Sequence, residues 1–205
     1  MFDSFEQDGF YYMVFEFCGG GDLHGYMKKY QFGTSEQQAR LIIYQIIQAC
    51  KYCRSYDIAH RDIKPGNILL NSDGYVKLAD FGFSRPVQFN PEEICTIGVG
   101  THGYRSPESD DGDYSKGDEY SIGVVLFKLM TGRLPFGDPV KNMRTFLNNQ
   151  DEDKYNFKDL EVQPSPMCKD LIASLVKKNV EQRMGFNQLL EHEFIAGFRV
   201  EYLEV

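Results

Sequence analysis

The stretch His60–Asn67 has the sequence HRDIKPGN, and thirteen residues after Asn67 the chain continues with Asp80–Gly82, DFG. Between the two motifs, Asn71–Gly74 (NSDG) joins an apolar run to an alternating one, which is a β-hairpin signal. Because a hairpin brings its two outer ends together, this one is expected to place the two motifs side by side. The polar residues of both motifs should therefore form one site.

The side chains of these motifs suit phosphate and metal chemistry. Asn67 supplies an amide oxygen and Asp80 a carboxylate, a pair of hard oxygen ligands suited to Mg²⁺, which also keeps phosphate oxygens in its shell. The carboxylate of Asp62 and the ammonium of Lys64 remain for a hydroxyl proton and a phosphate. A loop with chance charges would explain either motif alone, but two motifs in order across a predicted hairpin count against it.

The spacing HRDxKxxN followed by DFG resembles the catalytic and metal-binding loops of the protein kinases. That family is itself a standard example of phosphoryl transfer, so the roles of the individual residues are taken from the resemblance. It implies that Asp62 accepts the proton of the substrate hydroxyl and that Lys64 contacts the transferred phosphate. It also implies that Asn67 and Asp80 hold Mg²⁺ and that ATP is the phosphate donor.

The same resemblance implies an α+β, protein-kinase-like fold with a mainly α-helical large lobe and a truncated β small lobe. Residues 1–17 match a remnant small-lobe β-hairpin and hinge. Residues 18–205 match the large lobe, with its catalytic loop, activation segment and helical subdomain. The hairpin has aromatic residues on both arms, a turn at Asp8 and Gly9, and a strongly strand-like second arm, Phe10–Phe17.

Further residues are assigned to the nucleotide by resemblance. Glu16–Cys18 matches the hinge whose backbone hydrogen-bonds adenine, and Phe15 falls at the back of the adenine pocket. Asp22 matches an acidic residue that contacts the ATP ribose, although a helix N-cap suits its position equally well. The full expected ATP-binding set is Glu16, Cys18, Asp22, Asn67, Leu69 and Asp80.

The segment that ends at Gly100–Glu108 (GTHGYRSPE) resembles a kinase activation segment. Thr101 matches a threonine that links the base to Lys64 in serine/threonine-specific kinases, which implies protein substrates with Ser or Thr acceptors. Arg61 matches an arginine that binds a phosphorylated activation loop. Thr96 is the best acceptor for an upstream activating kinase, and an ordinary solvated threonine is an equal alternative.

Two polar signals mark the starts of long helices. Thr34 and Ser35 each offer a capping box for a helix that runs to about Arg54 with isoleucines along one face. Asp118 opens a second helix that is apolar nearly all round, as a buried helix is, and Thr131–Phe136 (TGRLPF) ends it. In kinases the residue matching Asp118 holds the catalytic-loop backbone, and an N-cap role is a compatible alternative.

The last part of the chain follows the family order. Asp170–Lys178 reads as an amphipathic segment, and Leu189–Ile195 resembles the helix that closes the kinase domain. Arg183 matches the family arginine that pairs with the glutamate of the SPE motif, Glu108. Breaking a buried pair of this kind from one side typically costs about 3–5 kcal/mol.

Composition excludes several function classes. The formal net charge of −8 and the pI of about 5.0 argue against a general nucleic-acid or anionic-membrane surface. No apolar run approaches the roughly 20 residues that span a bilayer, and the first residues carry no signal-peptide pattern. We therefore expect a cytoplasmic or nuclear protein with no membrane or nucleic-acid partner.

The chain has five cysteines, an odd number that fits free thiols in a reducing compartment. Cys50 and Cys53 form a C-x-x-C pattern, which can be a redox or zinc motif. No second pair follows, and both residues continue the isoleucine face of a predicted helix. Small buried thiols are the favoured interpretation.

The expected function is ATP-dependent phosphoryl transfer to protein Ser or Thr hydroxyls. The chain lacks the glycine-rich loop, strand lysine and helix glutamate that complete a kinase cleft, so residues 1–205 alone are expected to transfer phosphate weakly or not at all. The alternative is a catalytically impaired kinase fragment or pseudokinase that acts as a protein-binding scaffold. An aromatic hairpin cut from a sheet is also an aggregation hazard.

The sequence carries one hint of substrate preference. Kinases that prefer basic peptides often carry a glutamate at the positions matching Gly66 and Lys128. Neither position is acidic in this chain. We therefore expect at most a weak preference for arginine two residues before the phosphoacceptor.

Overall fold

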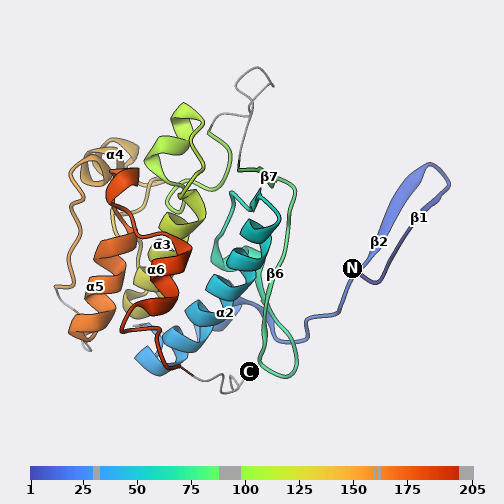
Figure 1. Cartoon of the computed structure of the whole chain (residues 1–205), viewed down its shortest axis with the longest axis horizontal. Coiled ribbons are helices and arrows are strands. Elements are labelled where there is room, and N and C mark those ends of the chain that lie inside the picture. The colour runs from blue at the N-terminus through green and yellow to red at the C-terminus, as the bar shows by residue number, and fades with distance from the viewer. Residues whose placement is uncertain (30–32, 88–97, 159, 161–162, 199–205) are drawn as a thin grey trace.

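The computed structural model describes residues 1–29, 33–87, 98–158, 160 and 163–198. As predicted, the fold is α+β, with a helical body and a few short strands (Figure 1). The helices are α1 (Leu23–Lys28), α2 (Glu36–Ser55), α3 (Gly117–Thr131), α4 (Met143–Asp151), α5 (Pro166–Leu175) and α6 (Phe186–Glu191). The strands are β1 (Asp3–Gln7), β2 (Phe10–Val14), β3 (Gly21–Asp22), β4 (Ile58–Ala59), β5 (Ile68–Leu70), β6 (Val76–Leu78) and β7 (Arg85–Pro86).

Strands β1 and β2 form the predicted antiparallel hairpin, which extends away from the helical body (Figure 1). Asp8 and Gly9 both have positive φ angles, 54° and 77°, which is the conformation of a type I′ hairpin turn. The second strand ends at Val14, before the predicted end at Phe17. All residues of both strands are exposed on both faces, so the hairpin adds no side chains to the core.

The hairpin predicted between the two motifs is confirmed. β5 and β6 pair antiparallel with Ile68 opposite Leu78, and the turn between them is closed by the side chain of Asn71. Its Oδ1 atom accepts hydrogen bonds from the backbone N–H groups of Asp73 and Tyr75, at 3.1 and 2.8 Å. β3 adds a third strand beside β5, and β4 pairs with β7. None of these three two-residue strands, β3, β4 and β7, has a sequence pattern long enough to predict.

The core lies between α2 and α3. The capping box that starts α2 is formed by Ser35 with Gln38, and the isoleucines of this helix are buried, as predicted. α3 is buried along almost its whole length and ends at Gly132, whose φ of 71° is the left-handed C-cap conformation. At Gly123 a Cβ atom would lie 2.6 Å from the Cβ of Leu175, so glycine allows α3 and α5 to pack closely.

Two helix boundaries differ from the prediction. α5 starts at Pro166, before the predicted Asp170, because the Ser165 hydroxyl caps it by accepting a hydrogen bond from Cys168 N at 3.1 Å. α6 covers Phe186–Glu191 and not Leu189–Ile195, because His192 takes an extended backbone conformation that ends it. The apolar pattern identified both segments, but the capping residues fixed their ends.

The cysteines of the C-x-x-C pattern lie on α2. Cys50 is buried and Cys53 is partly buried, and neither forms a disulfide. Burial raises the pKa of both thiols, Cys50 most strongly. Among the described residues no group of three or more His, Cys, Asp and Glu side chains could hold a metal ion. Both thiols therefore pack as small apolar groups.

Candidate active site

The backbone at the start of the HRDIKPGN loop is held by one buried carboxylate. Asp118, in the first turn of α3, accepts hydrogen bonds from the backbone N–H groups of His60 at 2.8 Å and Arg61 at 2.9 Å. Arg61 has a φ of 68°, an unfavourable value for a side chain of this size, so the loop needs such support. Lys116 occupies the N-cap of α3, which excludes the N-cap alternative for Asp118.

The side chains of Asp62, Lys64 and Thr101 meet in the predicted site. The Thr101 hydroxyl donates to Asp62 Oδ1 at 2.8 Å, and the Lys64 ammonium donates to Asp62 Oδ2 at 2.7 Å. Lys64 also donates to the Thr101 hydroxyl, at 2.8 Å, which closes a triangle of hydrogen bonds. The structure thus brings together a carboxylate from the loop and a hydroxyl from the activation segment, as the sequence predicted.

These partners set the protonation state of Asp62. Burial acts to raise the pKa of its carboxyl, but the hydrogen bonds from Lys64 and Thr101 outweigh it and hold the pKa below its usual range. The carboxylate therefore stays ionised at neutral pH. Each of its oxygens has more than one lone pair, so Oδ1, which accepts only from Thr101 among the described residues, can still accept a proton.

Asn67 and Asp80 lie at the two ends of the β5–β6 hairpin. The hydrogen bond from Ala79 N to the Asn67 carbonyl, at 2.9 Å, brings them close in space. The Asn67 amide nitrogen donates to both the backbone and the carboxylate of Asp62, each at 2.9 Å, so its amide oxygen faces no demand from these hydrogen bonds and has the chemistry of a metal ligand. Asp80 is exposed with a φ of 63°, and its carboxylate accepts from Gly82 N. This amide and carboxylate pair fits Mg²⁺.

The other expected nucleotide residues gather on the small sheet of β3, β5 and β6. Asp22 pairs with Leu69 across β3 and β5, and Leu69 pairs with Lys77 across β5 and β6. The Lys77 ammonium forms a salt bridge of 3.0 Å with the Glu16 carboxylate, which lowers the pKa of Glu16. The Cys18 carbonyl accepts from Gly21 N at 3.1 Å. The sequence analysis did not predict that Lys77 lies at this site. Its position in the alternating run Tyr75–Leu78 does indicate which face of the strand its side chain occupies.

Asp22 has a structural role in addition to its expected contact with the nucleotide, and two phenylalanines near the hinge are exposed. Asp22 caps α1, because its Oδ1 atom accepts a hydrogen bond from Gly25 N at 2.6 Å. Its Oδ2 atom is still able to accept from a sugar hydroxyl, so the two expected roles are compatible. Phe15, expected at the back of the adenine pocket, is 59% exposed, and Phe17 is 89% exposed.

Arg61 contacts the start of the activation segment and a residue that follows its end. Arg61 donates to the Phe83 carbonyl at 2.6 Å and lies over the ring of Tyr114, 4.5 Å from its centroid. Tyr114 was not predicted to contact this arginine. Thr96, the proposed acceptor for an upstream kinase, lies outside the described residues.

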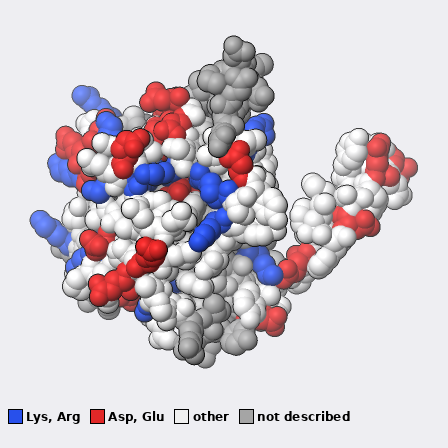
Figure 2. Space-filling view, in the orientation of Figure 1, with Lys and Arg blue, Asp and Glu red and all other residues white. Residues whose placement is uncertain are grey.

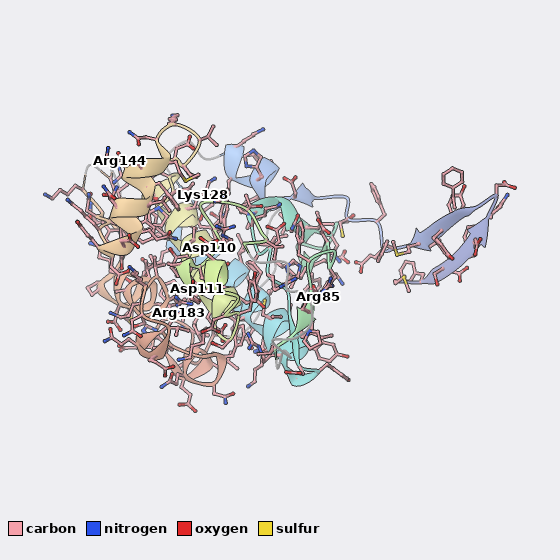
Figure 3. The ribbon with its side chains drawn as sticks, turned by 90° about the horizontal axis from the view of Figure 1, so that it is seen from above. Arg85, Asp110, Asp111, Lys128, Arg144 and Arg183 are labelled. Atoms are coloured by element: carbon pink, nitrogen blue, oxygen red, sulfur yellow. The ribbon has the colours of Figure 1, made fainter. Side chains whose placement is uncertain are left out.

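The predicted pair of Glu108 and Arg183 is confirmed and is bidentate. Arg183 Nη2 donates to Glu108 Oε2 at 2.9 Å, and Nη1 donates to Oε1. Arg183 is 1% exposed, and it also donates to the carbonyls of Lys116 and Lys177. Figure 3 shows Arg183 below the segment that carries Asp110 and Asp111. This arginine joins the end of the activation segment to the C-terminal helices.

The sequence profile of the protein kinase domain matches residues 1–195. This chain belongs to the protein kinase family. The kinase domain is 34% identical over 199 residues to the serine/threonine-protein kinase PLK4 of Nematostella vectensis, which covers 96% of this chain and 20% of that protein. It is 33% identical over 190 residues to the human SNF-related serine/threonine-protein kinase, which covers 91% of this chain and 24% of that protein.

The chain therefore spans only about a fifth to a quarter of the length of these relatives. Both relatives are named as serine/threonine kinases, which supports the same class for this kinase domain. On the face drawn in Figure 2, acidic and basic side chains are interspersed, and neither sign forms a large continuous area. None of the helices in the described part of the chain is both long enough and apolar enough to cross a membrane.

Proposed function

We propose that this chain supplies the catalytic half of a protein serine/threonine kinase that moves the γ-phosphoryl group of ATP to a Ser or Thr hydroxyl. The observation that carries the proposal is the hydrogen-bond triangle of Asp62, Lys64 and Thr101. It combines an ionised carboxylate with an ammonium group in one place. A threonine hydroxyl holds both, and this threonine is the feature that favours Ser and Thr over Tyr acceptors.

The proposed transfer assigns one task to each group. The substrate hydroxyl oxygen forms a bond to the γ-phosphorus, the bond from that phosphorus to the leaving ADP oxygen breaks, and the hydroxyl proton passes to Asp62. Lys64 has three N–H donors, and two of them bind Asp62 and Thr101. The third is available for an oxygen of the transferred phosphate. Positioning and charge stabilisation of this kind account for most of phosphoryl-transfer catalysis.

Asn67 and Asp80 would hold Mg²⁺, and Glu16, Cys18, Asp22 and Leu69 would line the nucleotide. A bound Mg²⁺ ion would neutralise negative charge on the phosphates. Asn67 also orients Asp62 through its amide nitrogen, so the same side chain serves the metal and the base. Arg61 and Thr96 remain the proposed elements of control by an upstream kinase.

One observation favours a second candidate function, a scaffold that binds protein partners. Every residue of the β1 and β2 strands is exposed, and the hairpin carries aromatic side chains on both faces. A surface of this kind is typical of a protein contact. The scaffold hypothesis predicts binding without phosphate transfer.

The test is transfer from γ-labelled ATP to three matched peptides with Ser, Thr or Tyr as the acceptor. It is done with residues 1–205 alone and with the same chain fused behind the glycine-rich loop, the lysine strand and the glutamate-bearing helix of a protein kinase. We expect weak or no labelling by the chain alone. The fusion protein should label Ser and Thr but not Tyr, and EDTA should abolish the label. A folded fusion protein that labels no peptide, or that labels Tyr equally well, would contradict the proposal.

A further inference from the structure

A pocket of about 710 Å³ in the helical body is lined by many acidic side chains. It lies between the 3₁₀-helix Pro107–Asp111, the C-terminal half of α4 and the segment that follows α5. We call it the acidic pocket. The charged side chains that line it are Glu108, Asp110, Asp111, Asp151, Asp153 and Lys178. Figure 3 shows Asp110 and Asp111 on the 3₁₀-helix.

The carboxylates of the 3₁₀-helix are only partly balanced by charges of the protein itself. Glu108 is bound by Arg183, and Asp110 forms an ion pair of 2.6 Å with Arg105. Asp111 is exposed, and it has no hydrogen-bond or ion-pair partner among the described residues. The carboxylate of Asp111 is therefore available to a ligand.

The wall at the end of α4 adds negative charge that is weakly held. Asp151 and Lys178 form an ion pair of 2.9 Å, but their side chains are 60% and 50% exposed, and an ion pair this exposed adds little stability. Asp153 Oδ1 accepts from the backbone N–H of Lys178 at 2.8 Å. The last carbonyls of α4 also carry partial negative charge. A cationic ligand can therefore compete with the Lys178 side chain at this wall.

One buried amide lines the acidic pocket with an unused acceptor. Gln150 is 6% exposed, and its amide nitrogen donates to the Tyr120 hydroxyl at 2.9 Å and to the Arg105 carbonyl at 3.3 Å. A carbonyl only accepts, so the nitrogen must face Arg105 and the amide oxygen must point away from it. No donor in the described part of the chain binds this oxygen. An N–H group of a ligand would satisfy it.

The lining suits an organic cation better than a metal ion. Within the described residues, no group of three or more His, Cys, Asp and Glu side chains could hold a metal. The acceptors alternate with the apolar side chains of Pro107, Leu147 and Val180. An arginine side chain matches both features, because its guanidinium group has five N–H donors and its aliphatic stem packs on apolar surface. Its planar fork binds a carboxylate through two N–H groups, which an ammonium group does not do.

We propose that the acidic pocket binds an arginine side chain from an exposed basic segment of a partner protein. The guanidinium group binds the Asp111 carboxylate and the amide oxygen of Gln150, and the aliphatic stem lies on Leu147. Asp151 and Asp153 add electrostatic attraction. Charge complementarity selects this occupant, since five carboxylates and one lysine line the pocket. This docking contact goes beyond the proposed kinase function and does not depend on phosphate transfer.

The test is a binding measurement by NMR. Two short peptides of glycine and alanine, without a Ser, Thr or Tyr acceptor, differ at one central position, which is arginine in one and its neutral isostere citrulline in the other. Each is titrated into isotope-labelled residues 1–205 at physiological salt. We expect the arginine peptide to shift the amide signals of Asp111, Leu147 and Gln150. It should bind about tenfold more tightly than the citrulline peptide, the size of one charge-assisted hydrogen bond.

Variants assign that preference to the acidic pocket. Asp111→Asn keeps the size of the side chain and should abolish the preference for arginine. Lys178→Met should strengthen binding of the arginine peptide about twofold to fivefold, because it removes the cation that competes for Asp151. Glu152→Gln is the matched control and should leave both affinities unchanged, since Glu152 is an exposed carboxylate next to Asp153 that does not line the pocket.

A second variant guards against misfolding. Asp153→Asn keeps an oxygen that can accept from the backbone of Lys178, and it should also reduce the preference for arginine; thermal melts check the fold of each variant. Equal binding of the two peptides would overturn the inference, as would a preference that survives in the folded Asp111→Asn and Asp153→Asn variants. Weaker binding by Lys178→Met, or shifts at Asp62 without shifts at Gln150, would also contradict it.

Discussion

The Thr101 hydroxyl joins the described part of the activation segment to the proposed base. It donates to Asp62 and accepts from Lys64, so it fixes the position of both side chains. Without it the direct ion pair of Lys64 and Asp62, at 2.7 Å, would remain. Thr101 therefore acts as a positioning residue, and its loss should displace the two charges without removing either.

The Thr101→Ala substitution should lower kcat of the fusion protein about tenfold to a hundredfold, the cost of a small misplacement of reacting groups. KM for ATP should change little, because Thr101 lies away from the expected nucleotide residues. Thr101→Ser keeps the hydroxyl and should restore most of the rate. Equal rates for the Ala and Ser variants would show that the hydroxyl has no positioning role.

Among the described residues, Arg183 is the largest fully buried polar side chain, and its partner Glu108 is partly buried, with 12% of its side chain exposed. Glu108→Leu should lower the free energy of unfolding by about 3–5 kcal/mol, because it leaves the guanidinium group without its charge partner. Urea denaturation measures the change. The double variant Glu108→Leu, Arg183→Met should lose much less than the sum of the two single variants, and additive losses would contradict a coupled pair.

At the scale of helices, α2 and α3 are joined by a buried contact between charged groups. Glu119 on α3 is 3% exposed and lies 3.5 Å from the Arg54 guanidinium of α2. Burial raises the pKa of Glu119 to about 7, and the Asp118 charge adds to this, while Arg54 and Arg183 act against it. The helix interface therefore contains a carboxyl group that titrates near neutral pH.

A raised pKa in the folded state makes stability fall as the pH rises from about 4.5 to 7, because the folded chain then holds a proton that the unfolded chain has lost. Glu119→Gln should remove this dependence, which amounts to about 3 kcal/mol over the window by the usual conversion. The free energy of unfolding in urea is compared at pH 5.5 and 8, an interval that contains about 2 kcal/mol of this change. Glu152→Gln, at an exposed position, is the control and should keep the wild-type dependence.

At the scale of the whole molecule, the β1–β2 hairpin contributes no buried residue, whereas the helical body contains the hydrophobic core. Every residue of β1 and β2 is exposed, and both edges of this two-stranded sheet have unpaired backbone groups. Residues 1–205 should therefore self-associate through the hairpin as the concentration rises.

Lysine on the second strand should reduce this association, because a charged side chain disfavours edge pairing. Tyr11→Lys and Met13→Lys, at positions 82% and 63% exposed, should raise the monomer fraction measured by sedimentation velocity. Val140→Lys, on an exposed loop of the helical body, is the matched control and should have no effect. Equal association of all three variants would place the contact elsewhere.

Sequence patterns predicted the β5–β6 hairpin and the helices α2 and α3, because these signals are local or belong to long periodic elements, whereas the resemblance supplied the fold class. The turn at Asn71 and the capping box at Ser35 are each encoded within a few residues. The resemblance supplied the pairing of Glu108 with Arg183, which lie 75 residues apart and share no local signal. The ends of α5 and α6 were missed because capping, and not apolar spacing, sets them.

The central claim is that Asp62, held by Lys64 and Thr101, accepts the proton in phosphate transfer. Its most direct test is the rate of labelling of a Ser peptide by the fusion protein and its Asp62→Asn variant, with Asp73→Asn in the exposed hairpin turn as the control. We predict that Asp62→Asn loses about 10²- to 10⁴-fold in rate, the usual contribution of a general base, and that Asp73→Asn keeps the wild-type rate. Equal rates for the wild type and Asp62→Asn would contradict the claim.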